Sequence, residues 1–444
     1  MRRRDTRLRT RMLAAALLAA GVIVCPVASP AVADDSIRED QWHLDAMHAS
    51  ELWNITKGEG VTVAVIDGGF KLDHPDLAGR FLPGKDFSGS PGGVGSYASG
   101  HGTQMASLIA GSGKSKGGQG AYGLAPGARI LPLKVANGSE GQLAPTDFLN
   151  QTGQAIDFAV DQGAKVINIS LGLPAYLASP GDVAKLNSVL VRAREKGALV
   201  VSSVGNSAQE GNRVEYPGAL PNVVGVGAVD RNGTVTAESE TGPQVTLVAP
   251  GMDMIEACTG PTGYCKSHGT SDSAALVSAS AALVWSMHKD WTANQILRVL
   301  INTAGKPTDG SNRTDDAGYG AARPRIALTD PGDPGPADVS PIPVANPSPS
   351  ASASPSPSVS AAASAAPTSA LLPSSSPVVA PAIESKAVDK ASDSGSTVPI
   401  VIAVVVGLVL VAGVVLFVVR RRSVADKPVV YESPMSPGDN SYMR

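Results

Sequence analysis

Six short apolar runs, rich in β-branched residues, constrain the fold of this 444-residue chain more than any other feature. Several are apolar at nearly every position, whereas a strand with one solvent face alternates apolar and polar residues. This pattern is typical of strands that are buried on both faces of a parallel sheet. The runs cover residues 61–66, 130–135, 165–170, 198–203, 223–228 and 245–248.

Two longer segments between these runs carry apolar residues at helical spacing, residues 146–162 and 182–196. Gly197 follows the second segment, where a helix C-cap is expected. Alternation of strands and helices predicts an α/β domain with a mostly parallel sheet and helices on both faces. In such sheets, functional sites form beyond the carboxyl ends of the strands, so the residues directly after each run are the candidates.

The first 33 residues carry the three parts of a secretory signal peptide. Six arginines precede an apolar run over residues 12–24, and Ala31-Val32-Ala33 supplies a small-x-small cleavage site. The unbroken apolar run argues against an amphipathic surface helix, and Val24 argues against a lipoprotein site at Cys25. We therefore expect cleavage after Ala33, and export.

A second apolar segment, residues 398–419, has no charged residue and is long enough to cross the hydrocarbon core as one helix. Arginines at 420–422 follow directly, and such positive charge stays on the cytoplasmic side. A buried core helix is the alternative, but core helices of this length are rarely so uniformly apolar. We predict a single-pass transmembrane helix in the cell membrane, a cytoplasmic tail over 420–444 and an extracellular domain.

Residues 331–397 are rich in Pro, Ser and Ala and lack the apolar content of a core, which predicts a disordered linker. The folded part is then residues 34–330, one domain by its length. The charge of the whole chain gives no indication of a nucleic-acid partner. The chain has 36 basic and 39 acidic residues, with no basic run away from the two ends.

Two candidate functional residues lie beside paired glycines. Asp67 follows the first apolar run in VAVIDGG, and His101 lies in GHGTQMASLIAG just before a predicted helix. Each has an ordinary explanation, since Asp-Gly commonly forms a turn and a lone histidine at a helix start is more often structural. The glycines around His101 favour a functional site, because they let another backbone approach the imidazole ring.

Two further candidates are Ser271 and Asn206. Ser271 precedes a segment crowded with Ala and Ser, where it would either cap a buried helix or aim its N–H at a developing negative charge. Asn206 follows the run 198–203 in SVGNSA, where it would form a turn or donate its amide to an oxyanion.

As a set, Asp67, His101, Asn206 and Ser271 resemble the active-site residues of the subtilisins, whose triad has the chain order Asp, His, Ser. The resemblance extends to five blocks within about residues 61–283. These are VAVIDGG, GHGTQMASLIAG, INISLG, SVGNSA and GTSDSAALVSASAAL. The chain thus resembles the subtilase family, which implies a subtilisin-like three-layer domain.

The resemblance also implies a serine endopeptidase mechanism. Ser271 would attack a peptide carbonyl, His101 would carry its proton, Asp67 would orient His101, and Asn206 would bind the oxyanion. No metal and no cofactor are implied. The residues expected to form the walls of the substrate cleft, and to pair with an extended peptide, are Ser170, Leu171, Gly172, Ser203, Val204 and Gly205.

The chain resembles the mycosins, the proteases of type VII secretion systems, in the order of its parts. These are a signal peptide, a subtilase domain, a Pro-rich linker and a terminal helix. About 30 residues separate the cleavage site from Asp67, too few for the folding prodomain of many secreted subtilisins. We expect a membrane-anchored protease that processes substrates of a type VII secretion system or acts with it. The alternative is a structural subunit that stabilises the secretion complex, with catalysis dispensable. A freely secreted digestive subtilisin is disfavoured by the anchor.

The sequence departs from the family pattern around the nucleophile. Asp272 and Ala275 stand where many subtilases have an apolar residue and a proline, and Leu173 stands where many have glycine. A carboxylate at Asp272 suits the first turn of a helix, but it would bring negative charge near the oxyanion and slow acylation. Leu173 would narrow the cleft.

Cys258 and Cys265 are the only cysteines that remain after signal cleavage. An even count in an exported chain predicts a disulfide between them. The rival is a metal site that includes His268, but Cys-x6-Cys-x2-His matches no standard zinc spacing.

Overall fold

The computed structural model describes residues 36–136 and 145–342. The predicted signal peptide, the predicted membrane helix over 398–419 and the tail lie outside these residues. Within the described ranges, no helix combines the length and apolar character needed to span a bilayer.

Seven parallel strands form the central sheet, in the order β2-β3-β1-β4-β6-β8-β9. Six of them coincide with the six apolar runs, which confirms the predicted parallel sheet. Strand β2 was not predicted, because two residues are too few to show a pattern. The strands are β1 (Thr62–Asp67), β2 (Lys85–Asp86), β3 (Arg129–Lys134), β4 (Val166–Ile169), β6 (Leu199–Ser203), β8 (Val223–Val229) and β9 (Val245–Pro250).

Strand β1 lies inside the sheet, with Ile66 in register with Leu133 on β3 and Ile169 on β4. Successive side chains of a strand point to opposite faces. Accordingly, Val63 and Val65 join one hydrophobic cluster and Ala64 and Ile66 join another. Burial of both faces explains why the runs do not alternate between apolar and polar residues.

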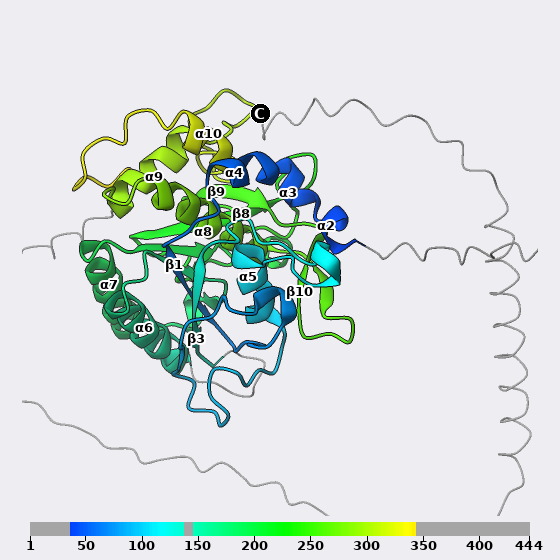
Figure 1. The fold of residues 1–444 in the computed structure, drawn as a ribbon. Coiled ribbons are helices and arrows are strands. Elements are labelled where there is room, and N and C mark those ends of the chain that lie inside the picture. The colour runs from blue at the N-terminus through cyan, green and yellow to red at the C-terminus, as the bar shows by residue number, and fades with distance from the viewer. Residues whose placement is uncertain (1–35, 137–144, 343–444) are drawn as a thin grey trace, which may run out of the picture. The chain divides into compact units, whose positions relative to one another are not determined.

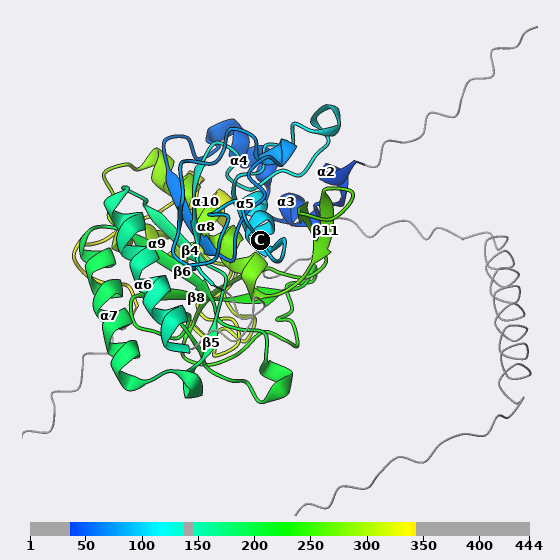
Figure 2. The same cartoon turned by 90° about the horizontal axis from the view of Figure 1, so that it is seen from below.

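Helices cover both faces of the sheet, as predicted (Figures 1 and 2). One face packs against α6 (Pro145–Asp161) and α7 (Pro180–Glu195), the two helical segments expected from the sequence. Gly197 lies just beyond α7 with φ 85°, so it has the left-handed conformation of a C-cap glycine. The other face packs against α4 (Ala49–Ile55), α5 (His101–Ala110), α8 (Thr270–Met287), α9 (Ala293–Asn302) and α10 (Pro324–Thr329).

Helix α8 is buried almost all round and packs against β4, β6, β8, β9 and α5. Its Ala and Ser residues let the neighbouring backbones approach closely. This burial fixes the position of Ser271 at the start of the helix.

The remaining elements surround this three-layer core. Two two-stranded antiparallel pairs, β5 (Leu173–Pro174) with β7 (Glu215–Tyr216) and β10 (Met254–Ala257) with β11 (Tyr264–Ser267), lie outside the main sheet. Near the N-terminus, α2 (Ile37–Asp40) and α3 (Trp42–Ala46) precede α4. Short 3-10 helices cover Pro75–Leu77, Lys116–Gly118, Ala175–Leu177 and Ala208–Glu210.

The start of the predicted linker differs from expectation, because residues 331–342 lie against α9. The Arg298 guanidinium donates hydrogen bonds to the carbonyls of Pro336 (3.1 Å) and Val339 (2.6 Å), and Asn294 donates to that of Ala337. A proline-rich segment has few N–H donors but keeps its carbonyls, which a guanidinium can bind. The folded domain therefore extends beyond residue 330. The rest of the predicted linker lies outside the described residues.

Candidate active site

Asp67 and His101 contact each other at the carboxyl end of β1. Asp67 is the last residue of the strand, and its oxygens lie 2.8 Å and 3.0 Å from Nδ1 of His101. The Asp67 side chain is fully buried, whereas that of His101 is 30% exposed. Because a carboxylate accepts hydrogen bonds, Nδ1 donates and Nε2 of the neutral ring is left as a proton acceptor. This arrangement suits a general base.

Gly102 allows α5 to approach β1. A Cβ at this position would lie 2.5 Å from the Gly69 carbonyl oxygen and 3.0 Å from Cβ of Asp67. The glycine next to His101 is therefore needed for close packing of the histidine helix against the aspartate loop. The sequence had instead suggested room for a partner or substrate.

Ser271 is the second residue of α8, and Gly269 is the N-cap. The N-cap explanation of Ser271 is therefore wrong. Its hydroxyl donates to the carbonyl of Ser170 at 3.1 Å, and the Ser170 hydroxyl donates back to the Ser271 carbonyl at 2.9 Å. Among the described residues, the Ser271 hydroxyl donates to Ser170 and not to His101. Such bonds in a ligand-free site commonly rearrange when substrate binds.

Asn206 lies beside Thr270 at the start of α8. Its Oδ1 accepts hydrogen bonds from the Thr270 backbone N–H (2.9 Å) and hydroxyl (3.0 Å). With Oδ1 engaged, Nδ2 remains as a donor. The Ser271 N–H is a second donor, because the first turn of a helix leaves its N–H groups without intrahelical acceptors. The two groups can stabilise an oxyanion formed at the nucleophile.

Asp272 was expected to bring negative charge near the oxyanion, and its side chain is buried beside β11. Its Oδ2 accepts a 2.7 Å hydrogen bond from the Ser267 hydroxyl on β11, and the side chain is buried. Nearby, the buried Glu256 of β10 accepts a 3.0 Å bond from Gln104 of α5. Burial raises the pKa of Asp272 to about 6. Burial and the charge of Asp272 raise the pKa of Glu256 well above its usual range.

These carboxyl groups act on His101. Burial alone would lower the pKa of His101, but the charge of Asp67 and the hydrogen bond to it more than offset this effect. The charges of Asp272 and Glu256 add to the increase, and the pKa of His101 is raised to about 9. Glu256, Gln104 and Ser267 were not predicted from the sequence, because the contact of Glu256 with Gln104 forms only when the β10–β11 pair folds beside α5, and no motif marks Gln104 or Ser267.

The predicted cleft walls follow two neighbouring strands. Residues 170–172 follow β4 and residues 203–205 end and follow β6, and these strands pair directly. Ser170 contacts Ser271, as described above, while Gly205 directly precedes Asn206. Val204 is fully buried, so its side chain does not face the cleft. Leu171 is partly buried and packs against the hydrophobic cluster beneath α6 and α7. Contact of these segments with a substrate stays a prediction.

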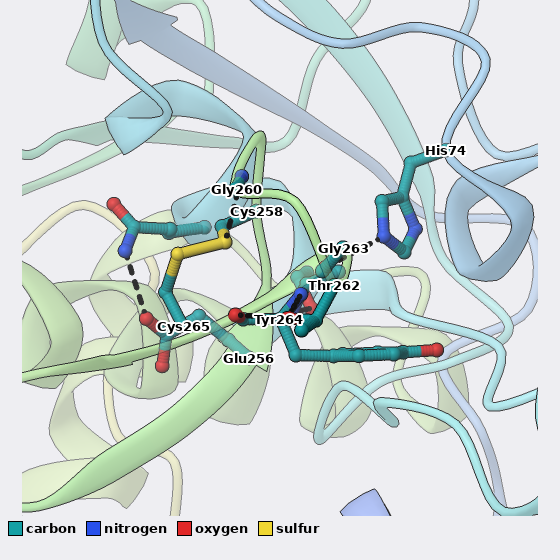
Figure 3. Close-up of a disulfide and its surroundings, with 11 residues drawn as sticks. His74, Glu256, Cys258, Gly260, Thr262, Gly263, Tyr264 and Cys265 are labelled. Atoms are coloured by element: carbon teal, nitrogen blue, oxygen red, sulfur yellow. Dashed lines mark hydrogen bonds between the residues drawn. A yellow bond between two sulfur atoms is a disulfide. The ribbon is translucent and has the colours of Figure 1, made fainter.

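The predicted disulfide joins Cys258 and Cys265, across the end of the β10–β11 pair (Figure 3). The rival metal site is wrong, because both sulfur atoms are in the disulfide. His268 instead places Nδ1 2.8 Å from Oε1 of Glu238. The disulfide stiffens the hairpin that carries Glu256 and Ser267, and hence the support of Asp272.

Comparisons with known proteins agree with this geometry. The family model described as "Subtilase family" matches residues 58–322. Subtilisin BL of Lederbergia lenta is 34% identical over 251 residues, which cover 56% of this chain and 84% of that protein. Among solved structures, MycP1 from Mycobacterium smegmatis matches with a TM-score of 0.58 and 28% identity, covering 69% of this chain and 88% of that one. The MycP3 protease from the type VII (ESX-3) secretion system matches with a TM-score of 0.56 and 31% identity, covering 65% and 87%.

Proposed function

The chain belongs to the subtilase family of serine proteases, and from this premise we propose that it is an exported endopeptidase of the mycosin type. The observation that carries the catalytic part is the Asp67–His101 pair at the end of β1, with Ser271 at the start of α8 and Asn206 bonded to the same helix turn. Both pairs of residues are held by buried elements. In the proposed mechanism these residues supply the base, the nucleophile and the oxyanion donors of acyl transfer.

The proposed reaction proceeds through an acyl-enzyme. Ser271 turns from the Ser170 carbonyl towards Nε2 of His101, loses its proton to it and attacks the peptide carbonyl. Asp67 holds the imidazole in the correct tautomer and stabilises the imidazolium. Nδ2 of Asn206 and the Ser271 N–H bind the oxyanion. His101 then gives the proton to the leaving amine, and a water molecule hydrolyses the ester by the same steps.

A role with a type VII secretion system is supported by the resemblance of the whole chain to the mycosins and by the structural matches to MycP1 and MycP3. The same resemblance supports a membrane anchor over residues 398–419 and an extracellular catalytic domain. If this topology is right, protease added to intact, wall-less cells will cut in the linker and release a fragment of about 30 kDa. Release only after lysis would contradict it.

Comparison of Ser271→Ala with a deletion of the whole chain tests the proposed role. Loss of a triad serine lowers kcat by about six orders of magnitude but leaves the surface of the domain intact. We expect the Ser271→Ala strain to secrete type VII substrates while one or more of them remain uncut, and the deletion strain to lose secretion. This outcome requires both a protease and a structural role.

Two other outcomes change the conclusion. Complete processing of all substrates in the Ser271→Ala strain would show that the chain is not their protease, and would favour the purely structural subunit. Identical secretion defects in the two strains would show that proteolysis alone is required. The secreted proteins of the two strains and the wild type are compared by mass spectrometry.

A further inference from the structure

A glutamate carboxyl lies against each of the two predicted cleft walls, at a glycine. A Cβ on Gly172 would overlap Oε2 of Glu215, and a Cβ on Gly205 would lie 2.5 Å from the carboxyl carbon of Glu240. Any other residue at either glycine would therefore displace a carboxyl group. The two glycines make room for negative charge on both sides of the same site.

Both glycines adjoin the catalytic groups. Gly172 lies two residues beyond Ser170, which exchanges hydrogen bonds with Ser271, and Gly205 directly precedes Asn206. The pairing of β7 with β5 holds Glu215 beside Pro174, just after the first wall. The carboxyl groups thus flank the point at which a peptide carbonyl meets Ser271 and Asn206.

Within residues 36–136 and 145–342, no Lys, Arg or His forms an ion pair with either carboxyl group. Glu240 is fully buried, and its Oε1 accepts from the Ser207 hydroxyl, while Oε2 has no hydrogen-bond partner among the described residues. Glu215 is only partly buried, so it can be reached from solvent. Arg213 is the positive group whose charge acts on both, but its own ion pair, at 3.9 Å, is with Glu210.

The pKa values of both carboxyl groups are raised, as expected for buried acids without a cation beside them. Burial, and then the charge of Glu240, raise the pKa of Glu215 to about 7, although Arg213 opposes the increase. Burial also raises the pKa of Glu240, against the hydrogen bonds of Ser207 and the charge of Arg213. A cation between the two carboxyl groups would stabilise their ionised forms.

We propose that Glu215 and Glu240 form an acidic subsite for the side chain of the P1 residue, whose carbonyl Ser271 attacks, and that the enzyme prefers Lys or Arg at P1. This inference rests on the proposed proteolytic function. The P1 side chain leaves the peptide next to the scissile carbonyl, between the segments that carry Gly172 and Gly205. A Lys ammonium or an Arg guanidinium can donate to the partly exposed Glu215 carboxylate and brings positive charge towards the buried Glu240.

The first test needs no variant. Peptides that differ only at P1, with Lys, Arg, Gln or Leu, are cleaved at pH 8, where Glu215 is mostly ionised. We expect kcat/KM for Lys and Arg to exceed that for Gln and Leu at least tenfold. Because all peptides use the same triad, the ratio between them isolates the subsite. Preference for Leu or Gln would overturn the inference while leaving the proteolytic function in place.

Two variants identify the residues responsible. Glu215→Gln and Glu240→Gln should each lower the Lys-to-Leu ratio at least tenfold, with a much smaller change for the Leu peptide. Glu195→Gln is the matched control, since it removes the same charge from an exposed residue at the end of α7 and leaves the Arg213–Glu210 pair intact, and it should leave the ratio unchanged. An unchanged ratio in folded Glu215→Gln and Glu240→Gln would contradict the assignment.

A binding measurement separates the subsite from catalysis. Benzamidine, a small cation that imitates a basic P1 side chain, is titrated calorimetrically into the Ser271→Ala protein. Binding that Glu215→Gln weakens at least tenfold supports the subsite even if no peptide is cleaved, in which case only the proteolytic function fails. Absence of benzamidine binding alongside cleavage after Leu would mean that only the subsite is wrong.

Discussion

Asn206 and Thr270 are joined by two hydrogen bonds, in which Oδ1 of Asn206 accepts from both the backbone N–H (2.9 Å) and the hydroxyl (3.0 Å) of Thr270. The Thr270 hydroxyl also accepts a 3.3 Å bond from the Gly205 N–H. The first turn of α8 thereby fixes which way the Asn206 amide faces. Preorganised donors stabilise an oxyanion more effectively than donors that must first be oriented.

Removal of the Asn206 amide should impair the chemical step. We expect Asn206→Ala to lower kcat by about 10²–10³ with little change in KM, because the donor acts mainly in the transition state. Thr270→Val should give a smaller loss, since Nδ2 remains but is no longer oriented by the hydroxyl. Steady-state kinetics on one peptide measure both. A normal kcat for Asn206→Ala would remove this residue from the mechanism.

The Asp67–His101 contact predicts an alkaline enzyme. His101 acts as a base only when neutral, so with a pKa of about 9 the rate should rise with pH and be half-maximal near pH 9. The profile of kcat/KM for a peptide without ionisable groups measures this. Asp67→Asn should lower kcat by about 10⁴, because the imidazole is then held in the wrong tautomer. A profile already flat above pH 7 would contradict the raised pKa.

The buried Asp272 predicts a shift of that profile. Above about pH 6 the carboxyl is ionised, and its charge favours the protonated form of His101. Asp272→Asn removes this charge, so the rising limb should move to lower pH. Asp253→Asn is the control, because Asp253 is a half-exposed carboxylate paired with Lys266 at 2.8 Å. If both variants keep the wild-type profile, Asp272 does not act on the base.

The disulfide between Cys258 and Cys265 should stabilise the domain. Closing so short a loop contributes about 2.5 kcal/mol in the chain-entropy model. For a domain of this size, that free energy corresponds to a decrease of roughly 4 °C in the Tm of Cys258→Ser. Reductant should lower the Tm of the wild type by a similar amount and leave that of the variant unchanged. Two free thiols in the unfolded, unreduced wild type would exclude the bridge.

The sheet, the helices α6 and α7 and the candidate triad could all be predicted from short stretches of sequence. Strands buried on both faces need continuous apolar runs, and helices packed on one face need helical spacing, so both leave patterns in neighbouring residues. The blocks around Asp67, His101 and Ser271 are likewise short stretches whose resemblance to the subtilases is visible without a structure. The pairing of Cys258 with Cys265 could be predicted because no other cysteine remains after the expected signal cleavage.

Contacts between distant segments were decided only by the tertiary structure. Asp272 and Ser267 are near in sequence, as are Gln104 and His101, but Glu256 reaches this group only because β10 folds beside α5. In the same way, Glu215 and Glu240 follow Asn206 by 9 and 34 positions, and nothing in their local sequence places them at Gly172 and Gly205. A carboxyl in a loop is ordinarily solvated, and burial by other segments is what changes its pKa and its chemistry. The sequence thus determined the scaffold and the candidate nucleophile, whereas the charges around them depend on packing between distant parts of the chain.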